Sequence, residues 1–207
     1  MTAKTIEWAR KIQALAQAGL TYSESPYERE RCVELREIAA EMMEASSDIS
    51  KAHWQHIFEN ETGYATPKVD VRGAVFENGK ILLSREKDDD CWSLPGGWAD
   101  VNDAPSKAVI RELREETGYA VTCKKLVAVL DRDLHYKGTS THPFHIYKLL
   151  FLCEHTGEAD ALCHDITDAA FFDLNALPPL SEHRTLPSHI ELLHKHHLNP
   201  DLPTVFD

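Results

Sequence analysis

The sequence predicts an α+β protein in which a small all-helical domain precedes a larger domain containing most of the strands. Two observations predict this class. Apolar residues recur at helical spacing in the first part of the chain, and past residue 68 they alternate as in half-buried strands. One acid-faced helix interrupts the strands and a last helix follows them. We therefore expect a helical domain over residues 1–62, a linker over 63–67 and a second domain over 68–207.

Three helices are expected in the N-terminal domain. The first covers residues 6–18, with Gly19 as its stop. The second begins with Ser25 as its cap and Pro26 at its first helical position, and Ser50 caps a shorter third helix. Their apolar side chains indicate either a homodimer interface or packing against the second domain: Trp8, Tyr27, Met42 and Met43.

The second domain opens with a hairpin. Strands over 68–76 and 81–85 flank a tight turn at 77–80, and a solvated acidic loop follows over 86–90. Further strands are expected over 121–130 and 144–153, separated by a polar loop over 131–143. Thr156-Gly157 reads as a simple turn, and Phe171-Phe172 as part of a short strand. The closing helix, 186–197, carries His194, His196 and His197, whose spacing does not suit zinc and which indicate a polar, partly frayed end.

The helix near residues 105–117 carries the most chemistry. At about 100° per residue, Glu112, Glu115 and Glu116 share roughly one third of its circumference, beside an apolar stripe that includes Val109 and Leu113. Neighbouring carboxylates repel one another, so a cation is expected there. Carboxylate oxygens suit Mg²⁺ or Mn²⁺. A solvated acidic face is the alternative.

Glycines border this helix on both sides. Pro95-Gly96-Gly97 precedes it, where the backbone can approach a ligand, and Gly118 follows it as a left-handed cap. The whole stretch resembles the Nudix box, with matches at Gly97, Arg111, Glu112, Leu113, Glu115, Glu116, Gly118 and Tyr119. Asp103 stands where the pattern has Glu. Because Asp is a good helix N-cap, we expect the loop and the start of the helix to be kept.

The resemblance implies a mixed β-sheet between helices over residues 68–207. The helical N-terminal domain, the GYATPKVDVRG connection and the PGGWADV loop together resemble the subgroup that hydrolyses nucleoside diphosphates linked to X, which includes ADP-ribose and CDP-choline pyrophosphatases. Many ADP-ribose pyrophosphatases carry a proline a short way past the box, where this chain has Leu134-His135. Both substrates therefore stay open, with a nucleoside monophosphate and phospho-X as products.

The resemblance also implies roles for individual residues. Glu112, Glu115 and Glu116 would bind the metal, with a backbone carbonyl near Gly97, and Arg111 would orient Glu115. Nudix enzymes often take a catalytic base from a later loop. The candidates here are Asp165, which we favour, Asp168 and, more weakly, Glu154 and Glu158, while a box glutamate such as Glu115 is the alternative base.

Substrate contacts are predicted from residue type and position. Arg72 and Arg85 lie on strands leading to the box and could bind phosphate, with structural ion pairs as the alternative. Trp98 could stack on a base or lie over a quaternary ammonium such as choline, with a buried packing role as the alternative.

Composition restricts the partners. The net charge of −12, from 34 acids against 22 Lys and Arg, argues against extended nucleic acid and anionic membranes. Five scattered cysteines without a CxxC pair, and the absence of an apolar leader or spanning segment, predict a cytoplasmic protein. Two other functions stay open: a nucleotide-sensing module that does not cleave, and a Nudix hydrolase of nucleoside triphosphates, dinucleoside polyphosphates or RNA ends. The complete set of three box glutamates favours the enzyme.

Overall fold

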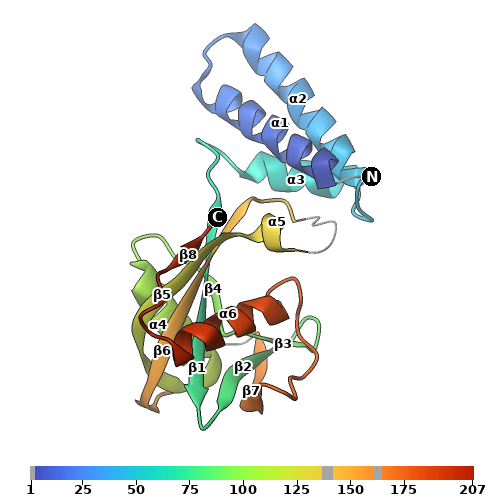
Figure 1. The fold of residues 1–207 in the computed structure, drawn as a ribbon. Coiled ribbons are helices and arrows are strands. Elements are labelled where there is room, and N and C mark those ends of the chain that lie inside the picture. The colour runs from blue at the N-terminus through green and yellow to red at the C-terminus, as the bar shows by residue number, and fades with distance from the viewer. Residues whose placement is uncertain (1–2, 137–141, 161–164) are drawn as a thin grey trace. The chain divides into compact units, whose positions relative to one another are not determined.

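The computed structural model describes residues 3–136, 142–160 and 165–207, and its elements group into two compact units. One unit holds the described parts of 1–68 and 135–145, and the other holds those of 69–134 and 146–207. The sequence-based division assigned 135–145 to the second domain instead. In chain order the elements are α1 (Ala3–Tyr22), α2 (Pro26–Glu44), α3 (Lys51–Asn60), β1 (Lys68–Glu77), β2 (Lys80–Glu86), β3 (Trp92–Ser93), β4 (Gly96–Trp98), α4 (Pro105–Thr117), β5 (Tyr119–Asp131), α5 (Arg132–His135), β6 (Ile146–Glu158), β7 (Ile166–Asp173), α6 (Pro187–Leu198) and β8 (Val205–Phe206) (Figure 1).

Helices α1, α2 and α3 form the first unit around a small apolar core that includes Trp54 and Phe58. Both predicted caps are confirmed, since Ser25 and Ser50 each accept a backbone N–H from the first turn of the helix that follows. The predicted stop at Gly19 is wrong, because α1 continues to Tyr22. A Cβ at Gly19 would collide with Cys32 Sγ of α2, so this glycine allows close helix packing and does not end α1.

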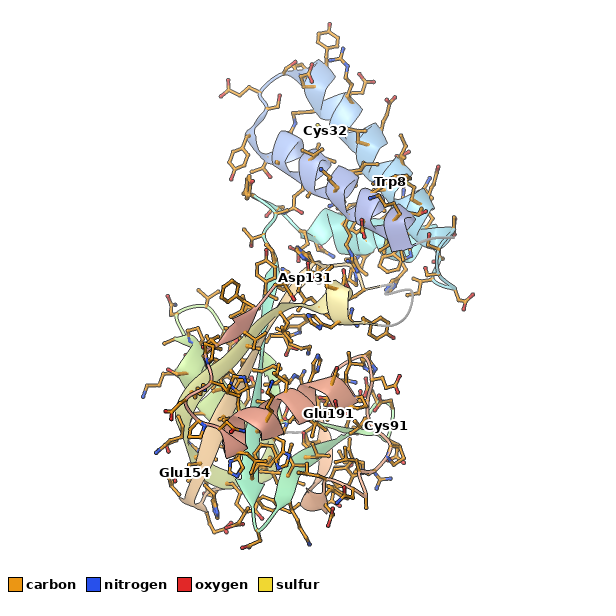
Figure 2. The ribbon with its side chains drawn as sticks, viewed as in Figure 1. Trp8, Cys32, Cys91, Asp131, Glu154 and Glu191 are labelled. Carbon is orange, nitrogen blue, oxygen red and sulfur yellow. The ribbon has the colours of Figure 1, made fainter. Side chains whose placement is uncertain are left out.

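Several apolar side chains of the helical unit are exposed. Trp8 on α1 (Figure 2) and Ile38 on α2 keep 52% and 47% of their surface accessible, while small residues such as Ala9 and Ala40 are buried in the core. The exposed apolar side chains of α1 and α2 are Trp8, Leu15, Tyr22, Tyr27, Val33, Leu35 and Ile38.

None of the helices in the described parts of the chain combines the length and the apolar character that crossing a membrane would need.

The second unit is a mixed sheet with helices on both faces, which confirms the expected fold class. Its described strands form one eight-stranded sheet in the order β3-β2-β1-β6-β5-β8, with β4 also paired to β1 and β7 to β2. The alternation along β1 decides which helix each residue meets. Val71 and Val75 pack with α4, whereas Ala74 packs with α6 on the other face. In Figure 1, α4 and α6 lie on opposite sides of the strands.

The β1–β2 hairpin follows the prediction closely. Phe76 pairs with Ile81, and the two turn residues Asn78 and Gly79 have φ values of 51° and 75°. Positive φ at both central positions is typical of the type I′ turn whose twist matches that of the flanking strands.

The later strands differ from the prediction. Strand β6 begins at Ile146 and pairs with β5 up to Glu158, so the predicted turn at Thr156-Gly157 is wrong. A one-turn helix, α5, occupies the start of the segment expected to be a polar loop, of which 137–141 lie outside the described residues. Strand β8 was not expected at all. It pairs in parallel with β5 through Ala128 and Val129, and no sequence pattern marks two residues near a chain end as a strand.

Candidate active site

The acid-faced helix is α4, and its apolar side packs on the sheet through Val109 and Leu113. Gly73 of β1 makes this contact possible, because a Cβ there would overlap Leu113 and lie 3.0 Å from Val109 Cγ2. The helix ends as predicted at Gly118, which has a φ of 72° and donates its N–H to the Arg114 carbonyl. The sheet therefore fixes which side of α4 carries the carboxylates.

The start of α4 differs from the prediction. Ala104 is the N-cap residue and makes no side-chain cap bond, so the expectation that Asp103 caps the helix is wrong. Asp103 Oδ2 instead accepts a hydrogen bond from Arg111 Nε at 3.2 Å. The shorter acid therefore still reaches the arginine of the helix.

The glycine loop lies directly against the carboxylates. Strand β4 pairs with β1, placing Gly96 opposite Arg72 and Gly97 opposite Val71. A Cβ at Gly97 would lie 3.0 Å from Glu112 Oε2, so any other residue would crowd that carboxylate. A glycine here lets the loop backbone approach the helix carboxylate closely, as an oxygen-lined cation site requires.

Arg111 holds two of the three box glutamates. Its Nη1 donates to Glu112 Oε1 at 2.9 Å and to Glu115 Oε2 at 3.2 Å, and Asp100 lies 3.0 Å from Nη2. Burial works against the guanidinium charge, but the surrounding carboxylates outweigh it and raise the pKa of Arg111. Arg111 therefore joins Glu112 to Glu115 within one turn of α4.

Glu116 is held separately, by β2 and by the glycine loop. Its Oε2 accepts the Gly96 N–H at 3.0 Å and the Ser84 hydroxyl at 3.1 Å. Burial raises the pKa of Glu116 to about 7, although Arg72 and the Gly96 N–H both act to lower it. Burial likewise raises the pKa of Glu112. A bound cation would relieve both carboxylates of this cost.

A buried cluster of charged residues on β1 and β6 lies beside the glycine loop. Asp70 Oδ1 accepts from Arg72 Nε at 2.9 Å, and Lys148 of β6 donates to Asp70 Oδ2. Lys148 is only 2% exposed, so burial, together with repulsion from Arg72, lowers its pKa to about 8 even though Asp70 opposes the change. Two cations share one carboxylate, and this lowers the pKa of Asp70 despite its burial.

Family models match both parts of the chain. Residues 3–58 match a model described as "UDP-X-like, N-terminal oligomerisation domain", and residues 66–195 match the NUDIX domain. The chain belongs to the Nudix family. It is a Nudix hydrolase in which an N-terminal helical region precedes the catalytic fold.

Known Nudix proteins are similar over most or all of the chain. A Bacillus subtilis (strain 168) protein named "Putative ADP-ribose pyrophosphatase YjhB" is 42% identical over 204 residues, which cover 99% of this chain and 97% of the relative. The crystal structure of an ADP-ribose pyrophosphatase from Streptococcus suis 89-1591 has 34% identity and a TM-score of 0.61, covering 69% of this chain and 100% of that one. The crystal structure of a UDP-X diphosphatase has 31% identity and the same TM-score, and covers 100% of both chains.

The predicted substrate residues of this Nudix hydrolase differ in their surroundings. Arg72 is buried and donates to Asp70 and to the Leu94 carbonyl, and Arg85 pairs with Asp90 at 2.7 Å. These contacts fit the structural alternative for both arginines. Trp98, by contrast, is 47% exposed on β4, so the buried-packing alternative does not describe it.

Asp165, the favoured base, comes directly before β7. Its carbonyl accepts the Lys87 N–H at 2.9 Å, which places it beside the end of β2. Ser84, which contacts Glu116, lies three residues earlier on β2, so Asp165 lies roughly 10 Å farther along that strand. The Asp168 carboxylate accepts a hydrogen bond from the backbone N–H of the next residue, Ala169.

Several residues of the Nudix site were missed or misread in the sequence. Glu86 was expected in a solvated loop but is 7% exposed in β2, where it accepts from Ser93 Oγ at 2.6 Å and pairs with Arg184 at 3.3 Å. Opposite charges at inward positions of two strands could have signalled the Asp70–Lys148 pair. Nothing in the sequence pattern connects Ser84 to the site.

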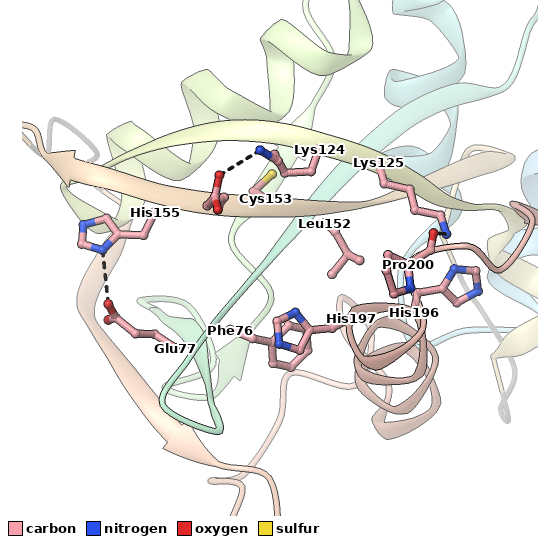
Figure 3. Close-up of a pocket in the computed structure, with 11 residues that line it drawn as sticks. Phe76, Glu77, Lys124, Lys125, Leu152, Cys153, His155, His196, His197 and Pro200 are labelled. Atoms are coloured by element: carbon pink, nitrogen blue, oxygen red, sulfur yellow. Dashed lines mark hydrogen bonds and ion pairs between the residues drawn. The ribbon is translucent and has the colours of Figure 1, made fainter.

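A pocket of about 480 Å³ lies away from α4, beside the C-terminal end of α6 (Figure 3). The expectation of a frayed, polar helix end is wrong here. His197 stacks on Phe76 with ring centroids 4.7 Å apart, and His196 is buried, because α6 packs its last turn against the sheet. Among the described residues, no three His, Cys, Asp or Glu side chains already converge as a metal site, in this pocket or on α4.

Proposed function

We propose that this Nudix hydrolase cleaves the diphosphate of a nucleoside diphosphate linked to X, with ADP-ribose as the first candidate substrate. The Bacillus subtilis relative, which matches nearly the whole chain, and the Streptococcus suis structure both carry that substrate in their names. The observation that carries the proposal is the complete carboxylate face of α4. Glu112, Glu115 and Glu116 are all present, Gly97 leaves room for the Glu112 carboxylate, and the Gly96 N–H binds Glu116.

The proposed cofactor is Mg²⁺ or Mn²⁺, held by the three glutamates together with a backbone carbonyl near Gly97. The donors fit because all are hard oxygens. Glu112 and Glu116 are partly buried, and the positive charge near them is too small to keep their pKa values low. When bound, the metal would neutralise phosphate charge and lower the pKa of a water molecule. Arg111 Nη1 donates to both Glu112 and Glu115 and so holds the two carboxylates near each other.

Other roles stay proposals. Asp165 is proposed as the base that takes the proton of the attacking water, with Glu115 as the alternative. Trp98 is proposed to stack on a ring of the substrate, since its side chain is exposed on the strand that follows the glycine loop. Arg72 and Arg85 would contact phosphate only by giving up the ion pairs they make with Asp70 and Asp90.

We also propose that the protein is a homodimer that works in the cytoplasm. The match of residues 3–58 to an oligomerisation domain and the exposed apolar side chains of α1 and α2 support the dimer. The cytoplasmic location remains a prediction from the cysteine content and charge of the sequence.

The test is product formation from ADP-ribose, CDP-choline, UDP-sugars, dinucleoside polyphosphates and nucleoside triphosphates, with Mg²⁺ or Mn²⁺ and after chelation. We expect a nucleoside monophosphate from ADP-ribose, and loss of activity in Glu116→Gln. Glu191→Gln is the matched control, because Glu191 is an exposed helical glutamate on α6 (Figure 2).

The panel also separates the alternatives. Turnover of CDP-choline or a UDP-sugar in place of ADP-ribose would keep the reaction and change the substrate. Binding of one nucleotide without any turnover, unchanged by Glu116→Gln, would refute the enzyme and favour the sensing module.

A further inference from the structure

Two cysteines face each other across the longest strand pair of the sheet. In the antiparallel ladder of β5 and β6, Cys123 pairs directly with Cys153. The register then shifts, so that Lys124 is an extra residue and pairing resumes between Lys125 and Leu152. Residues directly opposite in an antiparallel pair have Cα atoms about 4.5–5.5 Å apart, which lies within the range of roughly 4.4–6.8 Å that a disulfide spans. The backbone is thus already placed for a bond between them.

The two sulfur atoms are also neighbours. The Cys153 thiol donates a hydrogen bond to the sulfur of Cys123, and both cysteines are free thiols in the described structure. Cys153 is buried in the apolar cluster that includes Val109 and Leu113 of α4. Figure 3 shows its side chain on the opposite side of β6 from Leu152. Cys123 is only partly buried, so a small oxidant in solution reaches this sulfur first.

The surroundings of the two thiols shift their pKa values in opposite directions. The hydrogen bond from Cys153, helped by the Lys125 N–H and opposed by burial, lowers the pKa of Cys123. The same hydrogen bond, together with burial, raises the pKa of Cys153. The accessible sulfur therefore forms the thiolate, the reactive form, more readily than the buried sulfur does.

We propose that Cys123 and Cys153 form a reversible intramolecular disulfide when the protein meets a peroxide. The Cys123 thiolate attacks one peroxide oxygen, the O–O bond breaks, and water leaves after protonation of the released oxygen. The resulting sulfenic acid is attacked by the Cys153 sulfur, which loses its proton as the S–S bond forms and a second water leaves. Two thiols and one hydrogen peroxide thus give one disulfide and two waters, and a dithiol reductant restores the thiols.

The test uses the full-length reduced protein at neutral pH, exposed to increasing hydrogen peroxide and then blocked with N-ethylmaleimide. Peptide mass spectrometry without reduction is expected to show a Cys123–Cys153 linked peptide that is two hydrogens lighter than the two separate peptides and is lost with dithiothreitol. Cys123→Ser should abolish this species. Cys91→Ser is the matched control and should leave it unchanged, because Cys91 lies in the segment before β3.

A second variant covers the risk that a substitution disturbs the fold. Cys153→Ala, checked by circular dichroism, removes the resolving thiol and should trap the Cys123 sulfenic acid as a dimedone adduct. The proposal is overturned if Cys123 is oxidised in the wild type without a linked peptide, or if it links to another cysteine. It is also overturned if Cys123 reacts no faster than Cys91 across the peroxide series.

Discussion

Glu116→Gln should increase the stability of the metal-free protein while it removes activity. Glu116 accepts hydrogen bonds from Gly96 and Ser84 through one oxygen, and the amide oxygen of Gln can accept both. The substitution therefore keeps the local contacts and removes only a charge that burial disfavours. Functional sites commonly carry such a stability cost.

The size of the effect follows from the pKa of Glu116. The folded protein holds this proton up to about pH 7, whereas the unfolded chain releases it near the ordinary value of 4.5. The folded state binds more protons between these values, so the free energy of unfolding falls as the pH rises through this window. At about 1.4 kcal/mol per pH unit the full cost is about 3 kcal/mol. Because the side chain keeps some accessible surface, we expect Gln to recover about 1–3 kcal/mol at pH 8.

The assay is urea unfolding in EDTA at pH 8 and pH 4.5, with Glu191→Gln as the control. Glu116→Gln should have the higher unfolding midpoint at pH 8, and the difference should shrink at pH 4.5, where the wild-type carboxyl is protonated in the folded state. Adding Mg²⁺ should stabilise the wild type, by about 2.7 kcal/mol at a hundredfold excess over Kd, and the variant less. A variant that is less stable than wild type at pH 8 in EDTA would refute the reasoning.

Three further predictions concern the support of the site and the assembly. Between about pH 8 and pH 10.5 the unfolded chain keeps the Lys148 proton while the folded protein has lost it, so the free energy of unfolding of the wild type should rise with pH. Lys148→Met should remove this rise in urea unfolding, and a rise that persists in the variant would contradict the reasoning. Gly73→Ala should cost about 1–3 kcal/mol in the same assay because its Cβ overlaps Leu113, and a neutral result would show that α4 shifts freely. Trp8→Glu combined with Ile38→Glu should lower the mass measured by light scattering toward the monomer without loss of helix content, and an unchanged mass would place the interface elsewhere.

Local chemistry made part of the fold predictable from the sequence. Ser25 and Ser50 cap their helices, the Asn78-Gly79 turn closes its hairpin, and Gly118 ends α4, because each depends on residues only a few positions apart. Gly19 shows the limit of this reasoning. The glycine looked like a helix stop, but it is required by Cys32 of a neighbouring helix.

The candidate site was predictable along α4 and in the glycine loop that precedes it. The helical period places Glu112, Glu115 and Glu116 on one face, and Arg111 meets two of them within one turn. The partner of the third glutamate, Ser84, comes from a strand 32 residues away. Contacts of this kind depend on strand order and register, which no short-range pattern contains.

The residues of the box therefore divide by physical role. Gly97 leaves space that the Glu112 carboxylate occupies, and Gly118 adopts a left-handed conformation that ends the helix after the last acid. These glycines bind nothing through side chains, yet each fixes where a carboxylate can lie. Gly73 does the same from outside the box, because it sets the distance between α4 and the sheet. A signature that includes only the box residues therefore omits part of the geometry on which the chemistry depends. If α4 were transplanted to a sheet without a glycine at the position of Gly73, the helix would lie farther from the sheet and its carboxylates would be displaced from the glycine loop.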